Sequence, residues 1–230
     1  MLSTAYFLLF LVLVTILLWM SNLGMQNAQI TSSERRKYLL MIVGSLATWI
    51  LIQWIASTAG FYDNLSLPPR IPLFMIFPLF LFTIGFFYRN RTNQALHGIP
   101  IHLPIAYQSF RAVIELLFYF TFLEGILPIQ VTFEGANYDV LLGLSAIGVA
   151  IYATWPSASR RLLIAWNILG IAVVGFAAFT FISSFYFPSF WGQEEVPLAF
   201  NQFPYLLLPS FFMPSAIFIH ILSIVQLKTN

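Results

Sequence analysis

The amino-acid sequence predicts an all-α integral membrane protein, a bundle of about seven transmembrane helices. Hydrophobic residues make up 60% of the 230-residue chain and charged residues only 8%, whereas a soluble domain carries roughly 25% charged residues. The apolar residues also occur in runs of roughly twenty, the length that crosses a hydrocarbon core about 30 Å thick. Lys and Arg are concentrated in the short connections between these runs. A soluble fold of this size would have too few charged side chains to cover its surface.

The composition also excludes several classes of function. The chain has no cysteine, so it contains neither a disulfide nor a thiolate metal site. Its formal net charge of +2 is too small to suggest that it binds nucleic acid. Residues 1–20 lack the positively charged n-region and the small-residue cleavage site of a signal peptide. We therefore expect this stretch to be retained as the first span.

We expect one transmembrane domain, residues 1–230, whose orientation follows from its basic residues. The predicted spans lie near residues 4–20, 38–59, 71–88, 104–124, 138–155, 162–184 and 205–226. With these spans, eight basic residues fall on one side: Arg35, Arg36, Lys37, Arg89, Arg91, Arg160, Arg161 and Lys228. The other side holds Arg70 and most of the acidic residues: Asp63, Glu124, Glu134, Glu194 and Glu195. Because Lys and Arg accumulate on the cytoplasmic side, the N-terminus is predicted to lie outside and the C-terminus in the cytoplasm.

Two stretches are not expected to span the membrane. Residues 92–103 are polar and broken by Pro100, so we expect them at the cytoplasmic surface. Residues 185–203 mix seven aromatic residues with Glu194 and Glu195, a combination typical of the headgroup region. This outer loop is expected either to lie along the membrane surface, which we favour, or to cap a cavity.

The first three and the last three spans share an order of features. Each set has a basic pair before its second helix, Arg35-Arg36 or Arg160-Arg161, and prolines around its third helix. Transporters are often assembled from such repeats, here three spans, a linker span and three further spans. The alternative is that any seven-span protein has basic inner loops, and residue identity between the two halves is poor.

Span four carries the strongest polar signal in the chain. Gln108, Arg111, Glu115 and Tyr119 are spaced by three, four and four residues, so they form one stripe on a helix. Arg111 and Glu115 are positioned to pair along the helix, and Glu115 falls near the bilayer midplane, where an unpaired charge costs several kcal/mol. The stripe is therefore predicted to face the bundle interior or a water-filled cavity, either as a packing ion pair or as a binding or proton-exchange site.

Span five presents a face of small residues in line with a carboxylate. The small residues are Gly143, Ala146, Ala150 and Ala153. Such residues let helix backbones approach closely in lipid, so we expect this face to pack against another helix. Asp139, at the outer end of the face, is expected to pair with Arg70 or Arg111, or to bind a solute.

Spans two, six and seven add weaker polar signals. Span two has a stripe at four-residue steps: Ser45, Trp49, Gln53 and Ser57. Asn167 in span six is expected to form an interhelical hydrogen bond. His220 in span seven lies at about the depth of Gln108 and Arg111, and we expect it to be a hydrogen-bonded packing residue or part of a site.

Prolines interrupt two of the predicted spans. Pro78 lies in span three, and Pro209 and Pro214 lie in span seven. Each proline removes a backbone donor and frees a carbonyl, which protein or water must then satisfy within the membrane. Broken helices indicate transport sites in some proteins, although they are also common in ordinary spans.

Known intramembrane enzymes and cofactor proteins fit the sequence poorly. Residues 143–146 (Gly-Leu-Ser-Ala) differ at the last position from the serine motif of rhomboid proteases. Seven-span zinc hydrolases need several histidines at one depth, yet His97 and His102 lie in a surface segment. A retinal protein needs a Lys within its last span, and Lys228 lies past the end of span seven. No catalytic or metal-ligating residue is predicted, and no motif identifies a cofactor.

Residues 108–146 contain a pattern of polar, Gly and Pro positions. A Gln and an Arg open one span, Gly-x-x-Pro follows in the outer loop, and Gly-x-x-x-Asp-x-x-x-Gly-Leu-x-Ala enters the next span. The positions are Gln108, Arg111, Gly125, Pro128, Gly135, Asp139, Gly143, Leu144 and Ala146. This pattern resembles a family of uncharacterised bacterial multi-pass membrane proteins. The resemblance implies a bacterial origin, and the family provides no activity to carry over.

These observations lead to three hypotheses of function. The first is a small-solute transporter or ligand-binding protein of the bacterial inner membrane, with a site between spans four, five and seven. Its candidate residues are Gln108, Arg111, Glu115, Tyr119, Asp139 and His220. In this hypothesis Glu115 is the titratable or cation-binding group, and Arg111 fixes its charge state or binds an anionic solute. The second hypothesis is a membrane-embedded subunit or assembly factor that anchors a partner protein, and the third is an intramembrane enzyme acting on lipid or quinone.

Overall fold

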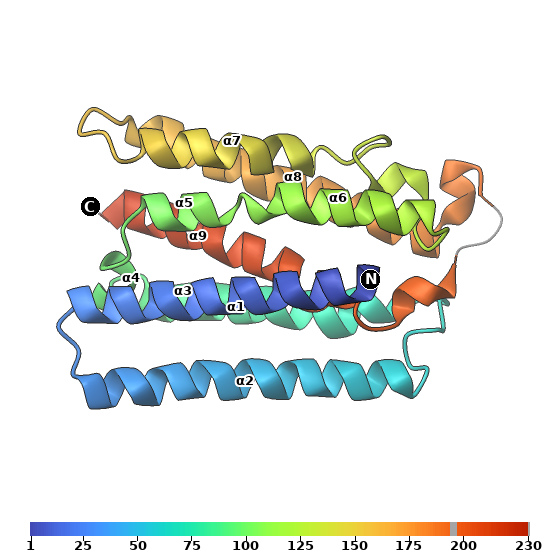
Figure 1. The fold of residues 1–230 in the computed structure, drawn as a ribbon, viewed down its shortest axis with the longest axis horizontal. Helices are drawn as coiled ribbons and strands as arrows, with labels where there is room; N and C mark the ends of the chain where they lie inside the picture. Colours follow the sequence, from blue (N-terminus) through green and yellow to red (C-terminus); the bar gives the residue numbers. More distant parts are fainter. Residues whose placement is uncertain (194–196, 230) are drawn as a thin grey trace.

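The chain forms a bundle of helices that run side by side along the long axis of the molecule (Figure 1). The structure is a computed structural model that describes residues 1–193 and 197–229, and these residues contain no strand. The α-helices are α1 (Leu2–Asn27), α2 (Ser32–Thr58), α3 (Phe77–Asn90), α4 (Gln94–His97), α5 (His102–Tyr107), α6 (Phe110–Leu123), α7 (Asp139–Tyr152), α8 (Arg160–Tyr186) and α9 (Met213–Thr229). The predicted all-α class is therefore confirmed for the described residues.

Five helices within the described residues are long and apolar enough to cross a membrane. They are Leu2–Asn27, Ser32–Thr58, Pro72–Asn90, Arg160–Tyr186 and Leu208–Lys228, and each coincides with a predicted span. The remaining two predicted spans differ, because residues 104–124 divide into α5 and α6, and α7 has only 14 residues. A helix of that length is about 21 Å long, shorter than a hydrocarbon core about 30 Å thick. The helices indicate an integral membrane protein, and the count of seven spans remains a prediction.

The connections that carry most of the basic residues lie at one end of the bundle. The α1–α2 connection, α4 and the α7–α8 connection gather there with the C-terminus, while the N-terminus lies toward the opposite end (Figure 1). Two of the long helices begin at this basic end with a side-chain cap, since Thr31 accepts from the backbone of Glu34, and Ser159 accepts from that of Leu162. Which compartment the basic end faces remains a prediction.

The predicted outer loop combines buried and exposed aromatic residues. It contains two 3-10 turns, η3 (Pro188–Trp191) and η4 (Leu198–Asn201). Phe185 and Phe200 are buried and stack with their ring centroids 5.2 Å apart, whereas Phe187 and Phe190 are exposed. Part of this segment therefore packs into the end of the bundle instead of lying only along its surface. Glu194 and Glu195 lie outside the described residues.

Two of the long helices begin with a π-helical turn. The turn η1 (Pro72–Ile76) precedes α3, and the turn η5 (Leu208–Phe212) precedes α9. Pro78 and Pro214 follow these turns as the second residues of α3 and α9. A proline has no backbone N–H, so in each helix the carbonyl four residues earlier loses its regular partner. Both halves of the proposed internal repeat show this feature, although the repeat itself remains a prediction.

Helix α2 supplies donors to both freed carbonyls. The side-chain Nε2 of Gln53 donates to the carbonyl of Phe74, four residues before Pro78, over 3.3 Å. The indole Nε1 of Trp49 donates to the carbonyl of Ser210, four residues before Pro214, over 3.0 Å. The weak polar stripe predicted in span two thus satisfies the backbone groups that the two prolines leave without a helical partner.

The same stripe fixes only one half of α2 to the bundle. Ser57 continues the stripe and donates to the carbonyl of Asn201 over 3.0 Å, whereas Ser45 is exposed. Residues 32–48 of α2 are almost entirely exposed, and α2 packs mainly along α1. In Figure 1, α2 accordingly stands apart at the edge of the bundle.

The small face predicted in span five packs against α6. Gly143, Ala146 and Ala150 are buried on α7. A Cβ atom added at Gly143 would lie 2.3 Å from the backbone nitrogen of Ala112 on α6, which is closer than van der Waals contact allows. The two backbones therefore meet at Gly143, and this contact brings Asp139 on α7 beside α6.

We expect Trp49→Phe to lower the free energy of unfolding by about 1 kcal/mol, because the Ser210 carbonyl loses its donor. In a Pro214→Ala background the new backbone N–H supplies a partner, so Trp49→Phe should cost less there. Thermal unfolding midpoints of the detergent-purified variants measure both effects. Trp54→Phe is the matched control, since Trp54 lies on the same helix and is 50% exposed. Equal losses in the two backgrounds would contradict this account.

Gly143→Ala should lower the free energy of unfolding by about 1–3 kcal/mol, because the added methyl group pushes α6 and α7 apart. Gly148→Ala on the same helix provides the control, since no atom lies within 4 Å of a Cβ added there. The control should match or slightly exceed the wild-type thermal midpoint, because alanine favours helix more than glycine does. A wild-type midpoint for Gly143→Ala would contradict the close packing.

Candidate functional site

A buried polar cluster joins four helices in the interior of the bundle. It contains Arg111 from α6, Asp139 from α7, Asn167 from α8 and His220 from α9. Arg111, Asn167 and His220 are buried, and 13% of the Asp139 side chain is exposed. Charged groups with so little access to water are expected to be paired with one another.

Arg111 and Asp139 form a two-point ion pair. The Nε of Arg111 donates to Oδ2 of Asp139 over 3.0 Å, and its Nη2 donates to Oδ1. Such parallel hydrogen bonds fix the guanidinium and the carboxylate in one plane. The pair confirms one of the two partners expected for Asp139. Arg70, the other expected partner, instead donates to the carbonyl of Phe61 and lies over its ring.

His220 extends the cluster from the ion pair to α8. The Nη1 of Arg111 lies 3.1 Å from Nε2 of His220, and because a guanidinium only donates hydrogen bonds, Nε2 must accept. The ring hydrogen is therefore on Nδ1, which lies 2.9 Å from Oδ1 of Asn167 and donates to it. Asn167 also donates from Nδ2 to the carbonyl of Leu163 over 2.8 Å. This arrangement defines neutral His220 with one tautomer and confirms the interhelical bond expected for Asn167.

Gly170 allows His220 to approach α8. A Cβ atom at Gly170 would lie 2.3 Å from both Nε2 and Cε1 of His220, so no other residue fits without displacing the ring. The carbonyl of Gly170 also lies 3.5 Å from Nη2 of Arg111. The α8 backbone thus helps to position both side chains.

Glu115 lies fully buried on α6 with only one of its carboxyl oxygens hydrogen-bonded. The Nδ2 of Asn137 donates to Oε1 of Glu115 over 2.6 Å and to the carbonyl of Val131 over 3.1 Å. The Oε2 atom of Glu115 is buried and has no hydrogen-bond partner. Asn137 connects this carboxyl to the ion pair, because its Oδ1 accepts from the backbone N–H of Asp139 over 3.2 Å.

The start of the polar stripe connects α9 to the junction between α5 and α6. The Nε2 of Gln108 donates to the carbonyl of Ala216 over 3.0 Å, and the hydroxyl of Tyr107 donates to that of Ser215 over 3.1 Å. Gln108 is fully buried and its Oε1 has no partner. Gln108 therefore lies near the cluster and contacts α9 without bonding to Arg111.

Two expectations for span four are wrong in detail. Arg111 pairs with Asp139, and within the described part of the chain no ion pair joins Arg111 to Glu115. Tyr119 lies outside the cluster, and its ring packs against Phe133 with the centroids 5.2 Å apart. Tyr119 lies one turn beyond Glu115 on α6, which brings it beside Phe133 of the α6–α7 connection.

A small cavity lies beside the ion pair. It has a volume of about 20 Å³, and its polar lining comes from Arg111, Asn137 and Asp139. A cavity holds one water when it offers about 10–15 Å³ to the water centre. The cluster as observed therefore has space for a species about the size of water and no space for a metabolite.

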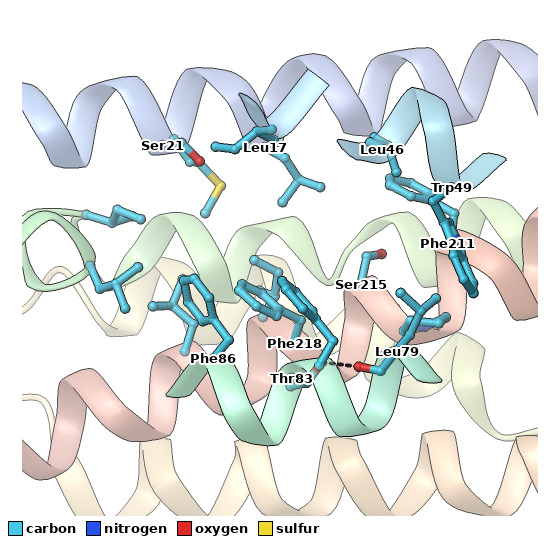
Figure 2. Close-up of a pocket in the computed structure, with 18 of the residues that line it drawn as sticks. Leu17, Ser21, Leu46, Trp49, Leu79, Thr83, Phe86, Phe211, Ser215 and Phe218 are labelled. Carbon is cyan, nitrogen blue, oxygen red and sulfur yellow. Dashed lines mark hydrogen bonds between the residues drawn. The ribbon is translucent and has the colours of Figure 1, made fainter. Parts of the chain in front are cut away.

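Helix α9 separates this cluster from a larger apolar groove. Ala216 and Met213 face the small cavity and His220 belongs to the cluster, whereas Ser215 and Ile219 line the groove. Figure 2 shows the groove and its labelled side chains from α1, α2, α3 and the α9 region. The two sites thus share one helix as a wall.

The cluster includes residues that the sequence-based site left out. Asn137 and Gly170 have no periodic signal, because Asn137 lies in a connection and Gly170 acts through its missing side chain. The small residues around Gly143 predicted close packing of span five. For Gly170, the corresponding signal was a glycine one helical turn after the polar residue Asn167. Among the described residues, no group of three or more His, Cys, Asp or Glu side chains is arranged to hold a metal ion.

The five long apolar helices among the described residues indicate a helical integral membrane protein. No protein-family model, no curated protein and no solved structure matches the chain.

Arg111→Gln and Asp139→Asn should each lower the free energy of unfolding by about 3–5 kcal/mol, since each leaves a buried charge without its partner. The double variant should lose clearly less than the sum of the two single losses. Unfolding of the purified protein in mixed micelles measures all three values. Arg70→Gln is a control outside the cluster and should cost much less. Additive losses in the double variant would show that the two side chains do not interact.

Proposed function

We propose that this chain is a small-solute transporter or ligand-binding protein of the bacterial cytoplasmic membrane. In this proposal Glu115 is the group that exchanges a proton or binds a small cation. Arg111, Asp139 and His220 form the charged surroundings that set the state of this carboxyl. The resemblance of residues 108–146 to a family of bacterial membrane proteins supports the bacterial origin in this proposal.

The observation that carries the proposal is the unpartnered Oε2 of Glu115. A polar side chain that serves only to join helices is expected to have its buried polar atoms satisfied. Glu115 instead is fully buried with Oε1 bonded to Asn137 and Oε2 without a partner. A carboxyl kept in this way within a membrane protein is characteristic of a group that changes its state during function.

The size of the small cavity limits what can enter the cluster, and Glu115 is connected to this cavity through Asn137, which lines it. About 20 Å³ beside Arg111, Asn137 and Asp139 accommodates water, a proton carried by water, or a small ion. A larger solute requires a movement that widens the interior. Helix α9 is the element best suited to this movement, because it contributes His220 and begins at the π-helical turn η5, and such turns are frequent at functional sites.

A membrane-embedded subunit or assembly factor is the second candidate function. The observation that favours it is the complete set of bonds made by Arg111, which donates to Asp139, His220 and Gly170. Such a network joins α6, α7, α8 and α9, as expected for a cluster that only stabilises the bundle. In this case the protein should depend on a partner for its stability.

Glu115→Gln tests the proposal, with Glu124→Gln as its control, since Glu124 directly follows α6 and is exposed. Thermal midpoints of the purified proteins are measured against a panel of alkali-metal salts and small metabolites, from mildly acidic to mildly alkaline pH. We expect a ligand or a pH change to raise the midpoint of the wild type and of Glu124→Gln. Glu115→Gln should lose that response, because an amide cannot exchange a proton or neutralise a cation.

The opposite result identifies the second candidate. If no ligand or pH shifts the wild type, and Glu115→Gln and Arg111→Gln lower the midpoint to similar extents, the cluster serves to stabilise the bundle. For a positive result, reconstitution into vesicles containing a pH-sensitive dye then shows whether an imposed gradient of the ligand drives proton movement through the wild type and not through Glu115→Gln.

A further inference from the structure

An apolar groove of about 360 Å³ runs between α1, α2, α3 and α9. Figure 2 shows around it Leu17 and Ser21 of α1, Leu46 and Trp49 of α2, and Thr83 and Phe86 of α3, with Phe218 of α9 packed beside Phe86. Its volume lies within the range of about 300–1,000 Å³ that is typical of pockets for small molecules. The groove is therefore large enough for a ligand, unlike the cavity in the polar cluster.

The interior of the groove suits an apolar chain. Its lining is mostly Leu, Ile, Phe and Met side chains. The hydroxyl of Thr83 donates to the carbonyl of Leu79 over 2.7 Å, and that of Ser215 donates to the carbonyl of Phe212 over 2.9 Å. These donors are satisfied within their own helices, so they are not directed at a polar ligand.

One end of the groove is closed and the other is open. Trp49 closes the first end by its hydrogen bond to the Ser210 carbonyl. From there toward its start, α2 lies apart from α3 and α9, and residues 32–48 are almost entirely exposed. The groove therefore opens between α2 and α3 along this exposed half of α2, which leads to the basic end of the bundle, where Ala95 and Leu96 of α4 also line it.

Two arginines flank this opening on the faces that line the groove. Arg35 lies seven residues before Ile42 of the α2 lining, and Arg89 lies three residues after Phe86 of the α3 lining. These spacings place each arginine on the groove side of its helix. Arg35 donates from Nη1 to the carbonyl of Ile30 over 3.0 Å, and its Nε is buried without a partner.

The surrounding charges add to this positive end. Arg36 and Lys37 on α2 and Arg91 in the α3–α4 connection are exposed at the same end of the bundle. The acidic residue at this opening is Glu34, whose carboxylate accepts from the hydroxyl of Thr31 over 2.8 Å. The net charge around the opening is positive, which matches an anionic headgroup.

We propose that the groove binds an anionic glycerophospholipid from the leaflet at the basic end of the bundle. One acyl chain lies between α2 and α3 and reaches toward Trp49. The phosphate lies between Arg35 and Arg89 and accepts hydrogen bonds from their guanidinium groups. The proposal is independent of the function assigned to Glu115.

The dimensions favour an acyl chain over a helix of a partner or of a second copy. A helix with side chains is about 10 Å across and would fill the volume of the groove within about one turn. An acyl chain is narrow enough to follow the groove along α2 from Ile42 to Trp49, a length of about 10 Å. A lipid also accounts for the joint presence of an apolar interior and a cationic opening.

Native mass spectrometry of the full-length protein, incubated with dioleoyl phosphatidylglycerol or dioleoyl phosphatidylcholine, tests the proposal. We expect one phosphatidylglycerol to be retained in preference to phosphatidylcholine. Arg35→Gln with Arg89→Gln should reduce that preference by roughly fivefold for each cation removed. Arg160→Gln with Arg161→Gln is the matched control, because this basic pair begins α8 at the same end of the bundle and does not line the groove.

A second pair of variants tests where the acyl chain lies. Leu46→Trp narrows the groove from α2 and should reduce retention of both lipids, whereas Leu144→Trp places the same bulk at an exposed position of α7 and should not. Leu17→Trp repeats the test from α1 if Leu46→Trp does not fold. Inorganic phosphate should not displace the lipid, because it lacks the acyl chain.

Three outcomes would overturn the assignment. Equal retention of the two lipids by the wild type would show that the arginines do not select an anionic headgroup. Wild-type retention in the groove-filling variants would place the lipid elsewhere on the bundle. A doubled protein mass that disappears in Leu46→Trp would identify a second copy of the chain as the occupant.

Discussion

The architecture depends on the requirement that every backbone polar group at membrane depth finds a partner inside the protein. Pro78 and Pro214 each deprive a carbonyl of its helical donor, and both deficits are met by side chains of α2. These two bonds hold one half of the least buried long helix against the bundle. The other half of α2 receives no such bond, which leaves the apolar groove open along that side.

The buried charges obey the same requirement through side chains. Arg111 is enclosed by acceptors from three other helices, and each acceptor is held by a further bond or by a glycine contact. Glu115 is the exception, since one of its oxygens is held by Asn137 and the other is free. All three guanidinium nitrogens of Arg111 are hydrogen-bonded, whereas one carboxyl oxygen of Glu115 is not, and this contrast distinguishes the candidate exchanging group from the residues around it.

Much of the fold was predictable because membrane spans are recorded in local composition. The long apolar helices and the small face around Gly143 followed from spacing within single helices, and Arg111 was one of the partners considered for Asp139. The pairing of Arg111 with Asp139 in place of Glu115 was not predictable, because it depends on how α6 and α7 are rotated. The bonds from Trp49 and Gln53 also required three-dimensional information, although the freed carbonyls themselves were expected from the prolines. Gly170 was missed because its contribution is the absence of a side chain, and only its position one turn from Asn167 marked it.

The position of α9 has a mechanical consequence. One face of α9 lines the apolar groove and the opposite face belongs to the polar cluster, so this helix cannot rotate or slide without altering both. Any molecule that binds in the apolar groove against α9 therefore opposes rearrangement of the polar cluster. By reciprocity, a change of charge in the polar cluster must alter the affinity of the apolar groove for its ligand. In the proposed lipid-bound state, lipid binding and the charge of the polar cluster would therefore be coupled through α9.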